Sequence, residues 1–120
     1  MFEYTAKVNR VIDGDTIDAT VDLGFSISIT ERFRLFGIDA PEPHSSNENE
    51  RILAKRSTER LRELVEGCTV TIKTHKPDKY GRWLAEIKTS DNILGTVNAQ
   101  LIAEGFAKQY FGIGDRPTWS

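Results

Sequence analysis

Hydrophobic and polar residues alternate along most of the first 35 positions of the chain. The apolar members of three alternating runs are Tyr4, Ala6 and Val8, then Ile17, Ala19, Val21 and Leu23, then Phe25, Ile27, Ile29, Phe33 and Leu35. A period of two puts apolar side chains on one face of a strand, so each run predicts a half-buried β-strand. Asp13-Gly14 between the first two runs predicts a tight hairpin. Glu31 interrupts the third run in phase, which predicts a sheet edge or a bulge there.

After Pro41 and Pro43 the spacing of the apolar residues becomes helical. From about residue 48 to residue 66 the apolar or small positions are Leu53, Ala54, Ser57, Leu61, Leu64 and Val65. Gly67 then provides a stop, so this segment predicts a helix. Residues 69–74 and 82–88 predict two further strands joined by a turn. A second, short helix is expected from the N-cap Thr96 to Gly105, followed by an irregular aromatic stretch over 106–120.

Five strands with a helix between the third and the fourth have the element order of an OB-fold barrel. This is an α+β, mainly β fold, here with two or three helices, and its partly open Greek-key form binds oligonucleotides. An unrelated α+β sheet would give the same order of elements. No repeat, low-complexity tract or linker divides the chain, so we expect a single domain over residues 1–120.

The composition is that of an ordinary soluble globular protein, with 38% apolar and 28% charged residues. The sequence has no signal peptide and no run that could span a bilayer. We therefore expect a monomer that is cytoplasmic, or secreted if a leader was removed. The single cysteine, Cys68, excludes an internal disulfide and a Cys/His zinc site. Its place at the head of an apolar run predicts a buried, inert thiol.

The net charge of −2 argues mildly against a nucleic-acid partner, because such domains usually carry a basic excess. The distribution of charge is more informative than the sum. Residues 1–24 are mainly acidic and residues 69–88 mainly basic. An acidic segment that holds a cation and a basic segment that holds phosphate would fit a metal-phosphate site, although chance would give the same distribution.

Two carboxylates are expected at one edge of the predicted sheet. Asp15 opens the second strand, and Asp39 closes the third. In a meander these two positions lie at the same edge, where carboxylates and loop carbonyls suit Ca²⁺ or Mg²⁺. The alternative is that Asp13 and Asp15 are only turn residues and that Asp39 forms an Asx-turn before proline.

Phosphate-binding and water-activating groups are also expected near that edge. Arg34 projects from the polar face of the third strand, and Arg82 follows the turn before the fifth. A guanidinium binds phosphate through two charge-assisted hydrogen bonds and keeps its proton. Glu42 lies three residues beyond Asp39, where a carboxylate could activate water beside a cation. The alternatives are exposed strand arginines and a surface loop glutamate, like Glu48 and Glu50 nearby. His44 and His75 lie in polar, loop-like contexts, and we expect no direct role for either.

Four segments of the chain resemble the signature blocks of staphylococcal-nuclease-like proteins, the thermonuclease family. They are residues 11–16 (VIDGDT), 33–42 (FRLFGIDAPE), 78–85 (DKYGRWLA) and 98–107 (NAQLIAEGFA). Their order and separation also match, and the resemblance extends from about residue 5 to residue 111.

The resemblance implies a five-stranded OB barrel and a Ca²⁺-dependent nuclease, with Mg²⁺ as a weaker substitute. Asp15 and Asp39 would bind the cation through their side chains and Ala40 through its carbonyl. Glu42 would act on the attacking water, and Arg34 and Arg82 would hold the scissile phosphate. The neighbouring nucleotides would be contacted by Lys79, Tyr80 and Tyr110, the last with Phe111.

The implied reaction is hydrolysis of single-stranded or frayed DNA and RNA, with water attacking phosphorus to leave a 5′-hydroxyl. Two other readings stay open. One is a nuclease-like module that only binds nucleic acid or a protein partner, as in relatives that have lost catalytic residues. The other is a structural OB domain, which would need no set of carboxylates and arginines.

Overall fold

The structure, a computed structural model, describes residues 2–91 and 95–119. Residues 1 and 120, the ends of the expected domain, lie outside that part, as do residues 92–94. The elements along the described chain are β1 (Glu3–Asp13), β2 (Thr16–Asp22), β3 (Ser28–Leu35), β4 (Ile38–Asp39), α1 (Glu48–Val65), β5 (Thr69–His75), β6 (Trp83–Lys88), α2 (Val97–Ala103) and β7 (Lys108–Gln109).

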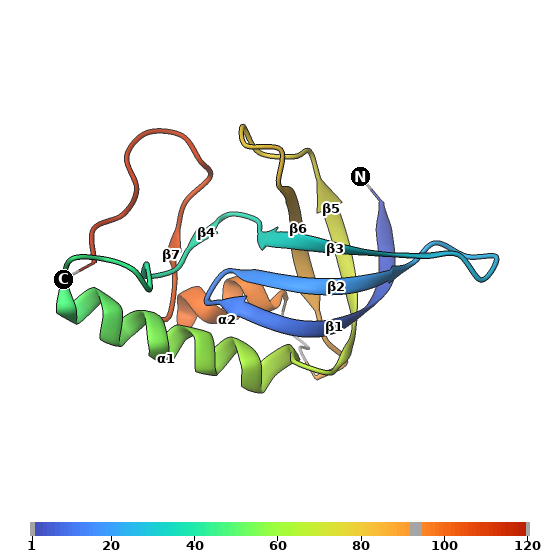
Figure 1. Cartoon of the computed structure of the whole chain (residues 1–120), viewed down its shortest axis with the longest axis horizontal. Helices are drawn as coiled ribbons and strands as arrows, with labels where there is room; N and C mark the ends of the chain where they lie inside the picture. Colours follow the sequence, from blue (N-terminus) through green and yellow to red (C-terminus); the bar gives the residue numbers. More distant parts are fainter. Residues whose placement is uncertain (1, 92–94, 120) are drawn as a thin grey trace.

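Five of these strands close into a barrel in the order β1-β2-β3-β6-β5, with β5 pairing back onto β1. All neighbours are antiparallel except β3 and β6, which pair in parallel over Phe33–Leu35. A separate ladder joins β4 to β7, and α1 lies along one side of the barrel, beside β1 (Figure 1). The expected five-stranded OB-type barrel, with a helix between its third and fourth strands, is confirmed.

The core is built by the alternation seen in the sequence. The apolar residues that alternate along β1 and β2 turn their side chains into the barrel. The apolar stripe of α1 packs against the barrel from outside. The largest fully buried side chains include Ile17, Leu35, Leu61, Ile72 and Ile87. Burying one such side chain stabilises the fold by about 1.5–3 kcal/mol.

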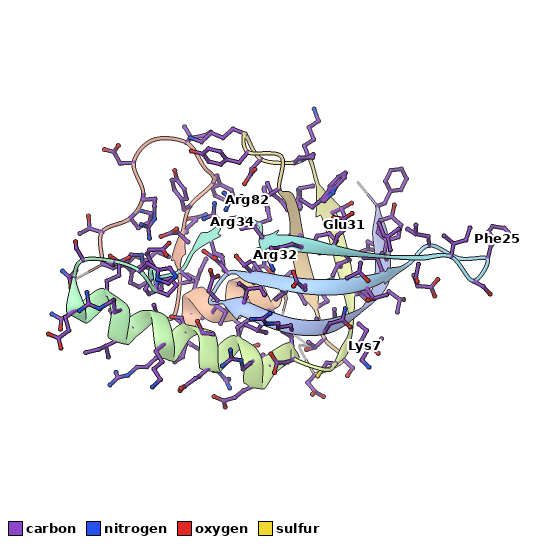
Figure 2. The ribbon with its side chains drawn as sticks, viewed as in Figure 1. Lys7, Phe25, Glu31, Arg32, Arg34 and Arg82 are labelled. Atoms are coloured by element: carbon purple, nitrogen blue, oxygen red, sulfur yellow. The ribbon has the colours of Figure 1, made fainter. Side chains whose placement is uncertain are left out.

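The third alternating run is only half correct as a prediction. β3 begins at Ser28, and the chain turns before it, where Phe25 and Ser26 have φ angles of 54° and 63°. Phe25 is 99% exposed because the hairpin of β2 and β3 extends past the barrel, where none of the described elements covers its tip (Figures 1 and 2). Ile27 and Ile29 are exposed for the same reason. The prediction that this half of the run is half-buried was wrong.

The sequence predicted either a sheet edge or a bulge at Glu31, and the structure has the edge. The pairing of β2 with β3 runs without interruption from Thr16–Arg34 to Asp22–Ser28, so the bulge alternative was wrong. β3 pairs with β6 only beyond Arg32, which leaves the other side of β3 at Glu31 without a paired strand among the described residues. The bulges of this barrel are in β1 instead.

The thiol of Cys68 is exposed, so the prediction of a buried thiol was wrong. The main chain at Cys68 links the end of α1 to β1, since its N–H donates to the Val65 carbonyl and its carbonyl accepts from the Val8 N–H. The inward face of β5 therefore begins only at Val70.

Both helices end near glycine, and α2 begins at Thr96, as expected; α1 also begins at a side-chain cap, which the sequence analysis did not predict. Asn47 caps α1 by accepting the N–H of Glu50, and Thr96 caps α2 by accepting the N–H of Ala99. Within residues 2–91 and 95–119, no helix is long and apolar enough to span a membrane.

One buried side chain ties α2 to the barrel. Asn98 accepts the Ile87 N–H (3.0 Å) and donates to the carbonyls of Phe36 (2.9 Å) and Ala85 (3.0 Å). It thereby satisfies polar main-chain groups of β6 and of the turn after β3. Of these groups, the Ala85 carbonyl has a second partner, since it also accepts the Phe36 N–H.

An ion pair joins the two helices and predicts a pH-dependent contribution to stability. Glu104 receives two hydrogen bonds from Arg60 and one from Gln100, and these lower the pKa of Glu104 to about 2. Because the folded pKa lies below the unfolded value of about 4.5, the pair stabilises the fold above pH 4.5, and this contribution disappears as the pH falls towards 2.

We therefore expect Glu104→Gln to lower the free energy of unfolding by about 1 kcal/mol at pH 7. The difference from the unmodified protein should vanish between pH 4.5 and pH 2 in urea titrations. Glu63→Gln is the matched control, since Glu63 meets the same Arg60 only at 3.6 Å and is well exposed. An equal loss in both variants, or a loss that does not depend on pH, would contradict this account.

Candidate active site

The side chains predicted for the site lie around one pocket of about 480 Å³. Its lining residues come from β4 and the loop after it, from the turn that precedes β6 and from the segment that follows β7. Figure 1 shows where these segments lie in the fold. The lining of the pocket includes every residue singled out from the sequence: Asp15, Arg34, Asp39, Ala40, Glu42, Lys79, Tyr80, Arg82 and Tyr110.

The hairpin between β1 and β2 brings Asp15 against Ala40. A Cβ on Gly14 would lie 2.8 Å from the Cβ atoms of both Ala40 and Ser57, so only glycine lets the turn approach this closely. Asp15 then accepts the Ala40 N–H at 3.0 Å. Asp13 stabilises the turn, because its carboxylate accepts the Asp15 N–H. For Asp13, the alternative interpretation as a turn residue is therefore confirmed.

Arg34 lies between the two carboxylates. Its Nη2 is 3.3 Å from an oxygen of Asp39 and 3.7 Å from an oxygen of Asp15. β3 supplies the arginine, and the β4–β7 ladder holds Asp39 by pairing it with Lys108. Asp39 is buried and is bound by charged and indole donors, so its carboxylate does not serve an Asx-turn.

The charge of Asp15 is incompletely compensated. Burial raises the pKa of its carboxyl group to about 6, and the neighbouring Asp13 adds to the rise. The Ala40 N–H and the charge of Arg34 act in the opposite direction without cancelling it. A cation bound beside Asp15 would stabilise the ionised carboxylate.

The oxygen donors of the pocket suit a hard cation. Among the described residues no three His, Cys, Asp or Glu side chains gather closely enough to hold a metal by themselves. The proposed ligands, Asp15, Asp39 and the Ala40 carbonyl, are all oxygen donors and would leave positions for water and phosphate oxygens. This donor set fits Ca²⁺ or Mg²⁺ and would not suit a metal that prefers sulfur or nitrogen.

Glu42 is held by its backbone while its side chain stays exposed at the pocket. Its N–H donates to Glu50 at 2.8 Å, and prolines flank it on both sides. Glu50 is only 8% exposed, so its interpretation as a surface glutamate was wrong. The Glu42 N–H, helped by Ser45 and Arg116, holds the pKa of Glu50 below its usual value. An ionised, buried Glu50 thus fixes the loop that carries Glu42.

The turn before β6 groups four side chains of the pocket, those of Asp78, Lys79, Tyr80 and Arg82. Asp78 accepts the N–H groups of Tyr80 and Arg82 and binds the Arg82 guanidinium at 2.7 Å. Lys79 and Arg82 each place their charged end 5.3 Å from the centre of the Tyr80 ring. Arg82 and Arg34 lie on the same side of the molecule in Figure 2, and both line the pocket.

Aromatic residues close the other side of the pocket. Tyr110 donates its N–H to Gly37 and its hydroxyl to Gly114. Phe111 lies against Phe36, whose other neighbour is the stacked ring of His75, 3.8 Å away. His75 is the last residue of β5 and pairs with Glu86, so its assignment to a loop was wrong. His44 is exposed.

Two further residues bind Asp39, and the sequence reasoning missed both. Arg116 donates through Nε and Nη2 at 3.0–3.2 Å, and Trp119 donates its indole N–H at 3.1 Å. They lie 77 and 80 positions from Asp39 in the sequence. Neither a helical nor a strand period pointed to them, because the segment between β7 and Trp119 has no regular structure.

The barrel and the pocket together define a staphylococcal-nuclease-like OB-fold protein. The sequence model described as "Staphylococcal nuclease homologue" matches residues 32–118, and the chain belongs to this family. The recognition of the family from its sequence blocks is confirmed.

Three curated relatives are nucleases by name. The chain is 31% identical to the micrococcal nuclease of Shigella flexneri over 122 residues, which cover 97% of this chain and 63% of the relative. It is 33% identical to the thermonuclease of Staphylococcus intermedius over 106 residues, 87% of this chain and 58% of the relative. It is 31% identical to the endonuclease YhcR of Bacillus subtilis (strain 168) over 117 residues, 91% of this chain and 9% of the relative. The chain thus spans less than two thirds of each relative.

Proposed function

We propose that the chain forms a single nuclease domain that hydrolyses phosphodiester bonds of single-stranded or frayed DNA and RNA in the presence of Ca²⁺. The observation that carries the proposal is the position of Arg34, which lies between two carboxylates in a pocket that also contains a second arginine. A structural domain would gain nothing from this arrangement. The nuclease names of the relatives support the same reaction class.

Asp15, Asp39 and the Ala40 carbonyl would hold the cation. A bound Ca²⁺ would neutralise negative charge on the scissile phosphate and make a coordinated water more acidic. Mg²⁺, which demands a smaller and more regular site, would be a weaker substitute.

Arg34 and Arg82 would bind the non-bridging oxygens of the scissile phosphate. Hydrogen bonds from their guanidinium groups strengthen as negative charge accumulates during attack on phosphorus. Arg34 is already fixed between the carboxylates, whereas Arg82 is held by Asp78 and has a half-exposed side chain. Arg82 would therefore exchange part of its pairing with Asp78 for the phosphate.

Glu42 would orient the attacking water and accept its proton. The carboxylate is exposed at the pocket, and the contact of its backbone with Glu50 fixes its loop. General bases of this kind act through direct contact with the water. One oxygen of Glu42 accepts the His44 N–H at 3.4 Å, so the water would meet the other oxygen.

Lys79, Tyr80 and Tyr110 would contact the nucleotides beside the scissile phosphate. Lys79 would pair with a neighbouring phosphate, while Tyr110, next to Phe111, would stack near a nucleoside. Because the net charge of the chain is −2, attraction of the polynucleotide would depend on the local positive charges around the pocket. One copy of the chain would supply all these contacts, so we propose a monomer.

The proposal is tested by incubating the protein with heat-denatured DNA in Ca²⁺ or in EDTA. We expect cleavage in Ca²⁺ and none in EDTA, and Asp15→Asn should behave in Ca²⁺ like the unmodified protein in EDTA. Asp22→Asn is the matched control, because Asp22 is an exposed residue at the end of β2 that only caps its own turn.

Equal cleavage in EDTA would refute the metal-dependent mechanism. Retained binding of DNA without any cleavage would instead favour the alternative of a nuclease-like module that binds nucleic acid. A loss of cleavage in Asp22→Asn as large as in Asp15→Asn would show that both variants act through the fold.

A further inference from the structure

The carboxylate of Asp39 is fully used by protein donors. Arg34, Arg116 and Trp119 together place four N–H donors on its two oxygens at 3.0–3.3 Å, and the residue is only 3% exposed. An ionised carboxylate accepts about four hydrogen bonds. The lone pairs that a cation would need on Asp39 are therefore engaged.

Arg116 also donates to the Ala40 carbonyl oxygen, a second oxygen that is expected to bind the cation. Its Nη2 lies 3.0 Å from Asp39 Oδ2, 3.4 Å from the Ala40 carbonyl and 3.3 Å from Glu50. Two of the three proposed cation ligands thus face one positive nitrogen. Asp39 raises the pKa of Arg116 above its usual value, so the guanidinium keeps its charge throughout the physiological range.

The segment that carries Arg116 is anchored at a few points only. Lys108 lies over the Trp119 ring at 4.6 Å and donates to the Thr118 carbonyl. Between these anchors, residues 111–116 are exposed and leave the body of the molecule as a loop (Figure 1). The side chain of Arg116 is itself 45% exposed, so its guanidinium is already partly hydrated and gains further hydration when it is released.

We propose that Arg116 is a built-in substitute for the divalent cation, which competes with Ca²⁺ for Asp39 and the Ala40 carbonyl and must leave them when Ca²⁺ binds. This inference rests on the proposed function, since it takes the same oxygens as the cation site. Trp119 reports the exchange, because its indole N–H binds the same carboxylate oxygen as Arg116 Nη2.

Geometry and charge make the two occupants antagonistic. Ca²⁺ binds oxygens at 2.3–2.6 Å, so an ion on Asp39 and Ala40 would lie within a few ångström of a guanidinium on the same two oxygens. Repulsion between like charges at this distance is strong in a partly buried pocket. Arg34 also faces two of the proposed ligands, at 3.3 Å from Asp39 and 3.7 Å from Asp15. Of the two arginines, Arg116 is the one that binds Asp39 through two nitrogens and also contacts the Ala40 carbonyl.

The competition is tested by measuring the affinity of the folded chain for Ca²⁺ calorimetrically, without any substrate. Arg116→Ala should bind Ca²⁺ about 10-fold more tightly than the unmodified protein, and Arg116→Lys, which keeps the charge without the paired contact, should fall between them. Arg32→Ala is the matched control: it removes one arginine whose partner is Asp18, outside the pocket, and should leave the affinity unchanged.

A second measurement does not depend on a variant of Arg116. In Trp83→Phe, Trp119 is the only tryptophan left, and its fluorescence should change as Ca²⁺ is added, in proportion to binding. A calorimetric isotherm with no accompanying change in fluorescence would contradict displacement of the segment.

The failure of this inference is distinguishable from the failure of the proposed function. Equal or weaker binding of Ca²⁺ by Arg116→Ala than by the unmodified protein overturns the competition alone, and weaker binding would make Arg116 a positioning residue for Asp39. Binding of Ca²⁺ to none of these proteins overturns both the competition and the Ca²⁺-dependent nuclease.

Discussion

Arg34→Ala should lower kcat for cleavage of denatured DNA about 10²–10³-fold, with a smaller effect on KM. The magnitude is typical for the loss of one preorganised donor to the developing charge of a transition state. Arg34 is preorganised here, since it projects from the face of β3 opposite to the core residues Phe33 and Leu35 and lies near both carboxylates. Removal of its positive charge also leaves the negative charges of Asp15 and Asp39 less compensated. Because the expected loss is in kcat, a higher substrate concentration would not restore the rate.

Arg32→Ala is the control for this prediction. Arg32 lies two residues away on the same face of the same strand, but its guanidinium is paired with Asp18 and is well exposed (Figure 2). Its loss should change kcat less than about 2-fold, in keeping with the small value of exposed ion pairs. Steady-state kinetics on one substrate measure both variants. Similar losses in both would mean that strand charge, rather than the position of Arg34, supports cleavage.

Asn98→Ala should lower the free energy of unfolding by about 3 kcal/mol. The side chain satisfies the Ile87 N–H and the Phe36 carbonyl, and each buried polar group left without a partner costs about 1–3 kcal/mol. The Ala85 carbonyl would keep a partner, because it also accepts the Phe36 N–H. The loss therefore comes from two groups rather than three.

Urea titrations measure this loss, with Asn9→Ala as the control. Asn9 makes one hydrogen bond to Thr20 at the exposed surface, and its replacement should change stability by less than about 0.5 kcal/mol. A loss below about 1 kcal/mol in Asn98→Ala would show that water or a shift of α2 replaces the amide.

The fold was predictable wherever burial follows a period. β1, β2 and both helices were found from apolar spacing and caps, because each has one face in the core. The prediction that the first residues of the third run are half-buried was wrong for the opposite reason. Phe25, Ile27 and Ile29 alternate like core residues but are 99%, 56% and 43% exposed, at and beside the end of the hairpin that extends past the barrel (Figure 1). Periodicity describes the faces of a strand, and it cannot state whether another element covers a face.

The site was predictable only in part. The pocket gathers Asp15 and Asp39 with Arg34 and Arg82, as their places in the sequence predicted. The prediction that Asp39 closes the third strand was wrong, because β3 ends at Leu35 and Asp39 ends β4, a separate strand that pairs with β7. Arg116, Trp119 and the burial of Glu50 were out of reach, because they depend on where an irregular segment crosses the molecule. Such contacts join residues far apart in sequence and have no local signal of propensity or spacing.

The ribbon formed by β2 and β3 also has a practical consequence. Its tip, around Phe25, bonds only within its own turn and lies far from the pocket (Figure 2). Exposed tips of this kind are the places where chains accept inserted peptides and chemical labels. A fluorophore or an immobilisation tag placed there would leave the barrel closed and the pocket open. The tip of this hairpin is therefore a suitable site for labelling or immobilising the protein.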